Sequence, residues 1–370
     1  MKDRVWKWLA KPVFYPVCAL LFSSACYGAQ DEMPKYLSKT GIYIFKSNQL
    51  SLADDLVPYE VRQKLFADYA LKWRAVKLGG GNKVMIDANG LFHFPNGTVF
   101  VKSFYYIRVN GSQKTLLKIS PQPTYKKIYR SMRRNIFLVE TRLLVLREGQ
   151  WYPYVYIWNR EQTDAVLEPG GNLQQLTFSS ASKDKHTLLY DVPSTLECAD
   201  CHGGYDVNGK VHPLGPTLDQ LNIDVTFKEG KYNQLEKWQD LGLLKGYDRK
   251  RFKPFVLTST EAKAREYLQV HCGHCHNPYG LAASSRLFLT RNIHDSYRYG
   301  VCKPHIATGL ASLGLLYDIY PGKPEKSLLL QRLKSDRPDV MMPELGRHWA
   351  DGTGVKLIAQ WIKSLPGRCD

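Results

Sequence analysis

The chain has 370 residues, of which 44% are hydrophobic, and its 51 Lys and Arg outnumber its 34 Asp and Glu to give a formal net charge of +17. This length can bury a sizeable core and suggests two or three domains. Such a charge either attracts acidic partners and anionic surfaces or serves solubility alone. No nucleic-acid recognition motif accompanies the charge, so nucleic acid is excluded as a partner.

The first 29 residues predict a signal peptide. Lys2, Arg4, Lys7 and Lys11 form a basic start, and residues 13–25 form an apolar run too short for a transmembrane span. Cleavage after Ala29 would give a periplasmic or secreted bacterial protein. Residues 23–26 (Ser-Ser-Ala-Cys) also resemble a lipoprotein box, so a membrane is expected as a partner only if Cys26 is lipidated.

Residues 36–192 have the pattern of a β-rich module. The Asn96-Gly97 pair between apolar runs predicts one hairpin. A second hairpin is predicted for residues 140–147 and 151–158, where aromatic residues alternate at period two. The amphipathic segment Val61–Trp73 predicts the one clear helix of this module. We expect the module to be sandwich-like.

Two Cys-x-x-Cys-His motifs follow, at residues 198–202 and 272–276. This motif is the signature of covalent c-type haem, because two thiols add to the vinyl groups of one porphyrin and the adjacent His ligates the iron. The sequence therefore predicts two covalently attached haem c groups. The predicted attachment residues are Cys198, Cys201, Cys272 and Cys275, and the predicted iron ligands are His202 and His276.

The cysteine pairs could also form a zinc site, a thioredoxin-like redox pair or ordinary disulfides. Structural zinc pairs usually lie about 15–20 residues apart, whereas Cys201 and Cys272 are separated by about 70 positions. A thioredoxin-like pair needs a βαβ context, which is missing around both motifs.

Residues 254–370 have the pattern of a complete cytochrome c domain. A capping box at Thr258-x-x-Glu261 starts a helix that leads to the second motif. Met342, directly before Pro343, supplies a thioether for the other side of the iron, as in His/Met cytochromes. An apolar stripe over residues 355–365 predicts a last helix. A disulfide between Cys302 and Cys369 is the economical expectation for an exported protein.

No Met-Pro loop follows the first motif, which lies in a segment and linker over residues 193–253 with a predicted helix at Asn233–Leu244. The opposite side of its iron is left to His212, His186 or no ligand. The predicted fold class is therefore α+β and multidomain: a signal peptide (1–29), the β-rich module (36–192), the first haem-bearing segment (193–253) and an all-α cytochrome c domain (254–370).

The chain resembles a family of uncharacterised secreted bacterial c-type haem proteins, which join an N-terminal β-rich module to a C-terminal cytochrome c module. The resemblance spans nearly the whole mature chain. It rests on residues 37–41, 94–98 with Lys102, 140–144, 151–159, 162–165, 214–215, 221–222, 321–322 and 342–343, with Ser327 and Arg332. Members are often encoded beside a parallel β-helix repeat protein, which the resemblance implies as a partner. The family implies no activity.

The sequence thus predicts an exported di-haem cytochrome that transfers electrons. The alternatives are a di-haem oxidoreductase of peroxidase or oxidase type with an open first haem, and a β-rich module that binds a partner or glycan; whether the chain is an enzyme stays open. A basic cluster within residues 126–134 favours an acidic redox partner. Its members are Lys126, Lys127, Arg130, Arg133 and Arg134.

Overall fold

A long β-hairpin lies at the centre of the fold. The computed structural model describes residues 33–369 apart from 47–48, 110–114, 119–134, 180–184, 204–209, 228 and 307–308. β9 (Ile136–Arg147) and β10 (Gln150–Trp158) pair antiparallel across Glu148 and Gly149. Both turn residues have positive φ, 48° and 76°, which matches the right-handed twist of the strands. The second predicted hairpin is confirmed.

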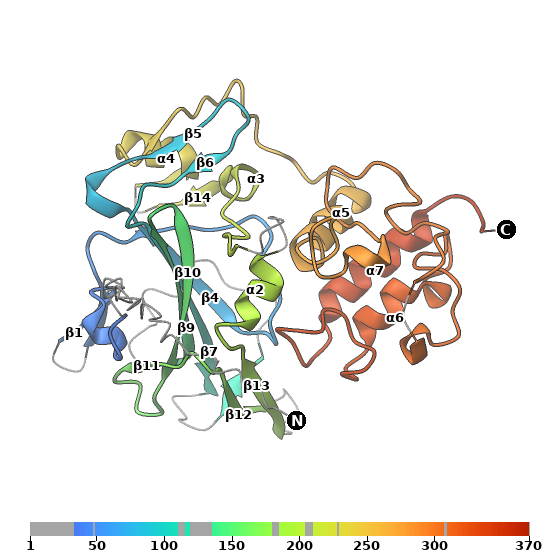
Figure 1. Ribbon diagram of the computed structural model, residues 1–370, viewed down its shortest axis with the longest axis horizontal. Helices are drawn as coiled ribbons and strands as arrows, with labels where there is room; N and C mark the ends of the chain where they lie inside the picture. Colours follow the sequence, from blue (N-terminus) through green and yellow to red (C-terminus); the bar gives the residue numbers. More distant parts are fainter. Residues whose placement is uncertain are drawn as a thin grey trace, which may run out of the picture. The chain divides into compact units, whose positions relative to one another are not determined.

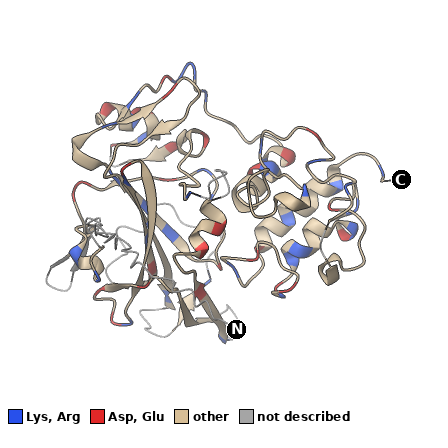
Figure 2. Ribbon diagram, in the orientation of Figure 1, with Lys and Arg blue, Asp and Glu red and all other residues tan. Residues whose placement is uncertain are grey.

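This hairpin belongs to a nine-stranded sheet in the order β11-β10-β9-β7-β8-β12-β13, with β4 and β3 branching from β7 (Figure 1). Its other strands are β3 (Val57–Pro58), β4 (Leu71–Lys77), β7 (Val99–Arg108), β8 (Leu116–Leu117), β11 (Ala165–Leu167), β12 (Asn172–Ser179) and β13 (Lys185–Val192). Figure 2 shows Lys and Arg within the strands of this sheet as well as on the helices.

The described residues also form three small sheets. Their strand pairing shows that the first predicted hairpin is wrong. β1 (Tyr43–Lys46) pairs with β2 (Gln49–Leu52), and β14 (Asp224–Thr226) pairs with β15 (Lys231–Asn233). β5 (Val84–Ile86) pairs with both β6 (Phe92–His93) and β16 (Leu244–Lys245). The Asn96-Gly97 turn exists, but it joins β6 to a strand of the large sheet instead of pairing the two flanking strands. Phe94, before the turn, packs on Phe100 and Trp151 of the large sheet, while Phe92 and His93 pair with β5.

The helix predicted at Val61–Trp73 is wrong. Residues 61–70 form an irregular loop and Leu71 begins β4. Asp68 and Tyr69 have φ values of 47° and 63°, which a right-handed helix cannot contain. Leu71 to Lys77 instead pair with β7, so tertiary strand pairing overrides the local helical pattern.

Six α-helices occur among the described residues: α2 (Glu197–His202), α3 (Leu218–Leu221), α4 (Gln234–Asp240), α5 (Thr260–His271), α6 (Leu328–Lys334) and α7 (Gly352–Ser364). Short 3-10 turns lie at Leu37–Lys39, Gly79–Gly81, Ala283–Ser285, Gly309–Ser312 and Pro324–Lys326. The helix predicted at Asn233–Leu244 is confirmed but shorter, since Asn233 caps it and Leu244 begins β16. The predicted last helix is α7, and the helix before the second motif is α5, capped by Ser259.

The predicted fold class is wrong. The described chain is mainly β, with 22% of it helical, and it gives no evidence of an all-α cytochrome c domain. Between Cys272 and Leu328 the described residues form turns, 3-10 helices and isolated β-bridges such as Val301 with Ile319. Glycines, prolines and charged residues fill this stretch and interrupt helical periodicity. The predicted sandwich is also wrong, because one large sheet forms instead of two packed ones.

Residues Pro34–Asp370 belong to one compact unit, and the boundaries predicted near 192 and 253 stay predictions. The signal peptide, Cys26 and the basic cluster at 126–134 lie outside the described residues. In the described part of the chain no helix is long and apolar enough to cross a membrane.

Three apolar clusters contribute to the core in the part of the chain that the structure describes. One joins the sheet to α3 and α4 around Phe100, Trp151 and Trp238. The second lies around Phe104, Val155 and Phe178. The third packs α5, α6 and α7 around Tyr267, Leu330 and Trp361, the last of which is 1% exposed.

The expected disulfide is confirmed: Cys302 is bonded to Cys369, with Cα atoms 5.2 Å apart and 67 positions between the residues. A bond that closes so long a loop restricts the unfolded chain. We predict that the variant Cys302→Ser/Cys369→Ser loses about 2–4 kcal/mol of unfolding free energy, measured by denaturant titration. A reductant should destabilise the wild type to the same level and leave the variant unaffected; equal midpoints for both proteins without reductant would contradict the role of the bond.

Candidate functional site

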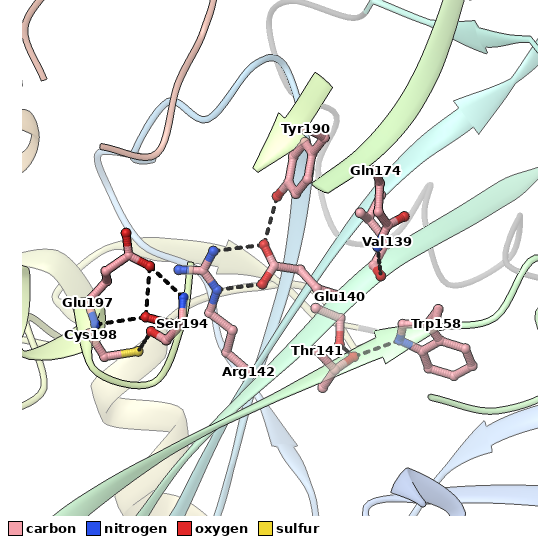
Figure 3. Close-up of polar contacts among 11 residues, drawn as sticks. Val139, Glu140, Thr141, Arg142, Trp158, Gln174, Tyr190, Ser194, Glu197 and Cys198 are labelled. Carbon is pink, nitrogen blue, oxygen red and sulfur yellow. Dashed lines mark hydrogen bonds and ion pairs between the residues drawn. The ribbon is translucent and has the colours of Figure 1, made fainter. Parts of the chain in front are cut away.

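The first Cys-x-x-Cys-His motif lies on α2, which a capping box orients. Ser194 Oγ accepts the Glu197 N–H at 3.2 Å, and the Glu197 carboxylate accepts the Ser194 N–H at 2.8 Å (Figure 3). These two bonds satisfy donors at the start of the helix. The Cys198 thiol donates to the Ser194 carbonyl at 3.5 Å. The sequence analysis missed this box, although Ser-x-x-Glu directly before the motif is a readable signal.

His202 has a defined tautomer. Its Nδ1–H donates to the backbone carbonyl of His212 at 2.7 Å, and the His212 N–H donates to the His202 carbonyl at 2.9 Å. Burial, with a smaller effect from the charge of Lys102, lowers the pKa of His202 to about 4. The ring is therefore neutral with its lone pair on Nε2. Histidines that bind metals usually have this arrangement, in which the second ring nitrogen donates to a carbonyl.

The second motif repeats the same arrangement. Cys272 caps the C-terminus of α5 and packs beside the α5–α6–α7 core cluster, where burial raises the pKa of its thiol to about 12. His276 donates from Nδ1 to the Leu287 carbonyl at 3.1 Å, and burial lowers its pKa to about 4. His276 is thus also a neutral imidazole with Nε2 as the free lone pair.

The fold brings the two motifs together. Ligand atoms of Cys201, His274 and Cys275 all lie within 4.8 Å of one another, although the first belongs to one motif and the other two to the next. The Cys275 thiol donates a hydrogen bond to Cys201, which lowers the pKa of Cys201 and raises that of Cys275. The four motif cysteines form no disulfide. Such a cluster of sulfur and imidazole donors also suits a transition metal.

His274 is the candidate site residue that the sequence motifs do not predict. It is 7% exposed, and its Nδ1 has no hydrogen-bond partner among the described residues. His274 occupies a variable position of the second motif, so nothing in the sequence distinguishes it. Only the contact with Cys201 reveals it.

A cavity of about 750 Å³ opens beside the first motif. Cys198, Cys201 and His202 line it, together with apolar side chains that include Leu144, Val155 and Val270. Its volume lies within the range of about 300–1,000 Å³ found for small-molecule and cofactor sites.

One wall of the cavity belongs to β9. Arg142 lines the cavity and makes two hydrogen bonds to the Glu140 carboxylate, from Nε at 2.6 Å and Nη2 at 2.8 Å. Glu140 is fully buried and also accepts the Tyr190 hydroxyl at 2.8 Å. Figure 3 shows Arg142 between this carboxylate and the turn that carries Cys198. Arg142 thereby connects the sheet electrostatically to the first motif, since its charge acts on the Cys198 thiol.

Met342 lies in the loop between α6 and α7, and Arg332 connects this loop to the second motif. The Arg332 carbonyl accepts the Met342 N–H at 3.1 Å, and its Nε donates to the Val340 carbonyl at 2.9 Å. The charge of Arg332 also acts on His276. Met341 is buried, at 5% exposure, whereas Met342 is half-buried. Met342 as the second iron ligand remains a prediction.

The structure places both histidines that the sequence offers for the opposite side of the first iron. His186 lies on β13 opposite Phe178 with its side chain exposed. His212 places its backbone carbonyl beside Nδ1 of His202. The choice between His212, His186 and no ligand stays a prediction.

The residues present fit a covalent haem at the first motif. Two unpaired thiols and an imidazole of the required tautomer face an apolar cavity of sufficient volume. The second motif also has two cysteines outside any disulfide and a histidine of the same tautomer, and its Cys272 packs against an apolar core.

No family model matches the chain, and neither a curated protein nor a solved structure matches it. The family resemblance predicted from the sequence therefore stays a prediction, and the function has to be inferred from the chemistry of the site.

Proposed function

We propose that this protein is an exported di-haem c-type cytochrome that transfers electrons. One observation carries the proposal: in both Cys-x-x-Cys-His motifs the histidine donates Nδ1–H to a backbone carbonyl, at 2.7 Å for His202 and 3.1 Å for His276. In each ring Nε2 is then the unprotonated nitrogen, which is the atom that would ligate an iron. Two matched histidines, each next to a pair of free thiols, support a common cofactor.

Different residues of the chain would attach the two haems and ligate their irons. Cys198 and Cys201 would attach one haem and Cys272 and Cys275 the other, while His202 and His276 would ligate the irons. Bound haem supplies reversible one-electron chemistry. The proximity of Cys201 to Cys275, within 4.8 Å between their sulfur atoms, supports electron exchange between the two groups. Export is predicted from the signal peptide. Residues 1–29 contribute +3 to the net charge of +17, so the exported chain keeps +14, which favours an acidic redox partner.

A second candidate is a di-haem oxidoreductase in which the first haem meets a substrate. The absence of a Met-Pro loop after the first motif favours it, because that iron then has no predicted thioether ligand. Cyanide or carbon monoxide binding to one of two haems would support this candidate. Two low-spin haems that bind neither ligand would support the carrier.

We predict that the mature protein carries two covalent haems. Its intact mass should exceed that of the polypeptide by two haem masses, and Cys198→Ala/Cys201→Ala should remove one of them. The matched control, Cys302→Ser/Cys369→Ser, should keep both haems, because those cysteines form the disulfide. A protein with no added haem and with zinc or copper in its place would instead assign Cys201, His274 and Cys275 to a metal site.

We also predict His276/Met342 ligation at the second motif. A thioether ligand raises the reduction potential relative to a second imidazole. Met342→His should therefore lower the potential of one haem and abolish its near-infrared thioether band. Met341→Ala is the matched control and should keep the band, since Met341 is buried in the same loop. If only Met341→Ala loses the band, the ligand is Met341 and not Met342.

A further inference from the structure

Three cations stand in a row across three neighbouring strands. Arg74 on β4 is the direct partner of Lys102 on β7, and Lys102 is the direct partner of Arg142 on β9. Directly opposed residues point to the same face of a sheet, with Cβ atoms about 4.5–5.5 Å apart. Like charges in these positions repel one another, so the row destabilises the sheet unless something compensates it.

Contacts within the chain compensate this row only in part. Among the described residues, Glu140 is the one carboxylate that forms an ion pair with any of the three cations, and it pairs with Arg142. Glu60 acts on Arg74 by its charge but forms its own ion pair with Lys64 at 3.3 Å. The Phe104 ring lies 4.8 Å from Lys102 Nζ and 4.7 Å from Arg142 Cζ. An aromatic face attracts a cation without neutralising its charge.

All three cations line the cavity beside the first motif. Arg74 is 8% exposed and Lys102 is half-buried, so water screens them weakly. Burial and the charge of Arg74 lower the pKa of Lys102 to about 7, so an anion beside it would favour the protonated form. Glu140 engages Nε and Nη2 of Arg142, which leaves the Nη1 donors of the guanidinium unused by that pair. The cavity therefore combines apolar walls with a concentrated positive charge and spare N–H donors.

We propose that the row Arg74–Lys102–Arg142 binds an oxyanion inside this cavity. Arginine and lysine are the side chains that recognise carboxylates and small inorganic oxyanions, and arginine does so with paired N–H donors. Two kinds of oxyanion fit this site. One is the pair of propionates of a haem attached at Cys198 and Cys201, and the other is a free inorganic oxyanion that enters as ligand or substrate. The propionate source rests on the proposed function, and the free oxyanion does not.

The test compares Lys102→Met with Lys77→Met in the purified holoprotein. Lys77 is the matched control, because it lies on the same strand as Arg74 but pairs with Asp55 at 2.7 Å and does not line the cavity. Sulfate is the probe, titrated calorimetrically in a low-salt buffer. The reduction potential of the first haem, identified by its loss in Cys198→Ala/Cys201→Ala, is the second readout.

A free oxyanion site predicts that sulfate binds the wild type and Lys77→Met equally, and Lys102→Met at least about tenfold more weakly. A propionate site predicts no sulfate binding and a lower first-haem potential in Lys102→Met only. Unchanged sulfate affinity, or no binding together with an unchanged potential, overturns the proposal. Arg74→Met serves as the second variant if Lys102→Met does not fold. A protein without haem refutes the proposed function, and the sulfate titration then decides the oxyanion site by itself.

Discussion

Hydrogen bonds from one loop of the β-rich part, residues 63–69, hold the segments around the second motif, and the candidate site depends on them. The Phe66 N–H donates to His271 Nε2 at 2.9 Å, and His271 Nδ1–H donates to the Tyr267 carbonyl at 2.8 Å. His271 directly precedes the second motif and is 2% exposed. Both ring nitrogens are therefore engaged, and burial lowers the pKa of His271 to about 3, so the ring stays neutral. This histidine has a structural role, unlike the two that keep a free Nε2.

The same loop also holds the segment that follows Met342. Asp68 accepts the backbone N–H groups of His348 at 2.8 Å and Trp349 at 2.7 Å. Asp68 is buried, and burial raises its pKa although both N–H donors lower it. A carboxylate removed from water is tolerated when hydrogen bonds replace the lost solvation. The positive φ of Asp68 is compatible with these bonds and incompatible with the helix that the local sequence favours.

Local sequence signals predicted the features that depend on few residues. The turn at Glu148-Gly149, the helices α4 and α5 and the apolar stripe of α7 each involve neighbours in the chain. The predicted cap of α5 was wrong by one residue, because Ser259 and not Thr258 accepts a backbone N–H there. The Cys302–Cys369 bond followed from simple counting of the cysteines. The helix at 61–73 was wrong because its end pairs with the distant strand β7. The hairpin at Asn96-Gly97 was wrong because Phe92 and His93 pair back onto β5, on the other side from the turn. The prediction of an all-α domain was wrong because it rested on two helices, whereas most residues between them form turns.

The site itself was predictable in its chemistry but not in its assembly. Each motif predicts its own thiols and histidine. The contact of Cys201 with His274 and Cys275 is not predictable in this way, because it joins residues about 70 positions apart in the chain. The cation row was invisible in the sequence for the same reason. Arg74, Lys102 and Arg142 are isolated basic residues in three separate strands, and only the register places them opposite one another.

The cation row also has a consequence for redox chemistry at His202. Its positive charges lie in a cavity of low dielectric, where they interact more strongly than in water. They favour the state of any nearby redox group that carries one more electron, and so they raise its reduction potential. An oxyanion in the cavity would offset this effect, and Glu140 already offsets part of it through Arg142. The balance between the cation row and the anions beside it therefore affects both the stability of the sheet and the ease with which a redox cofactor held at the first motif would accept an electron.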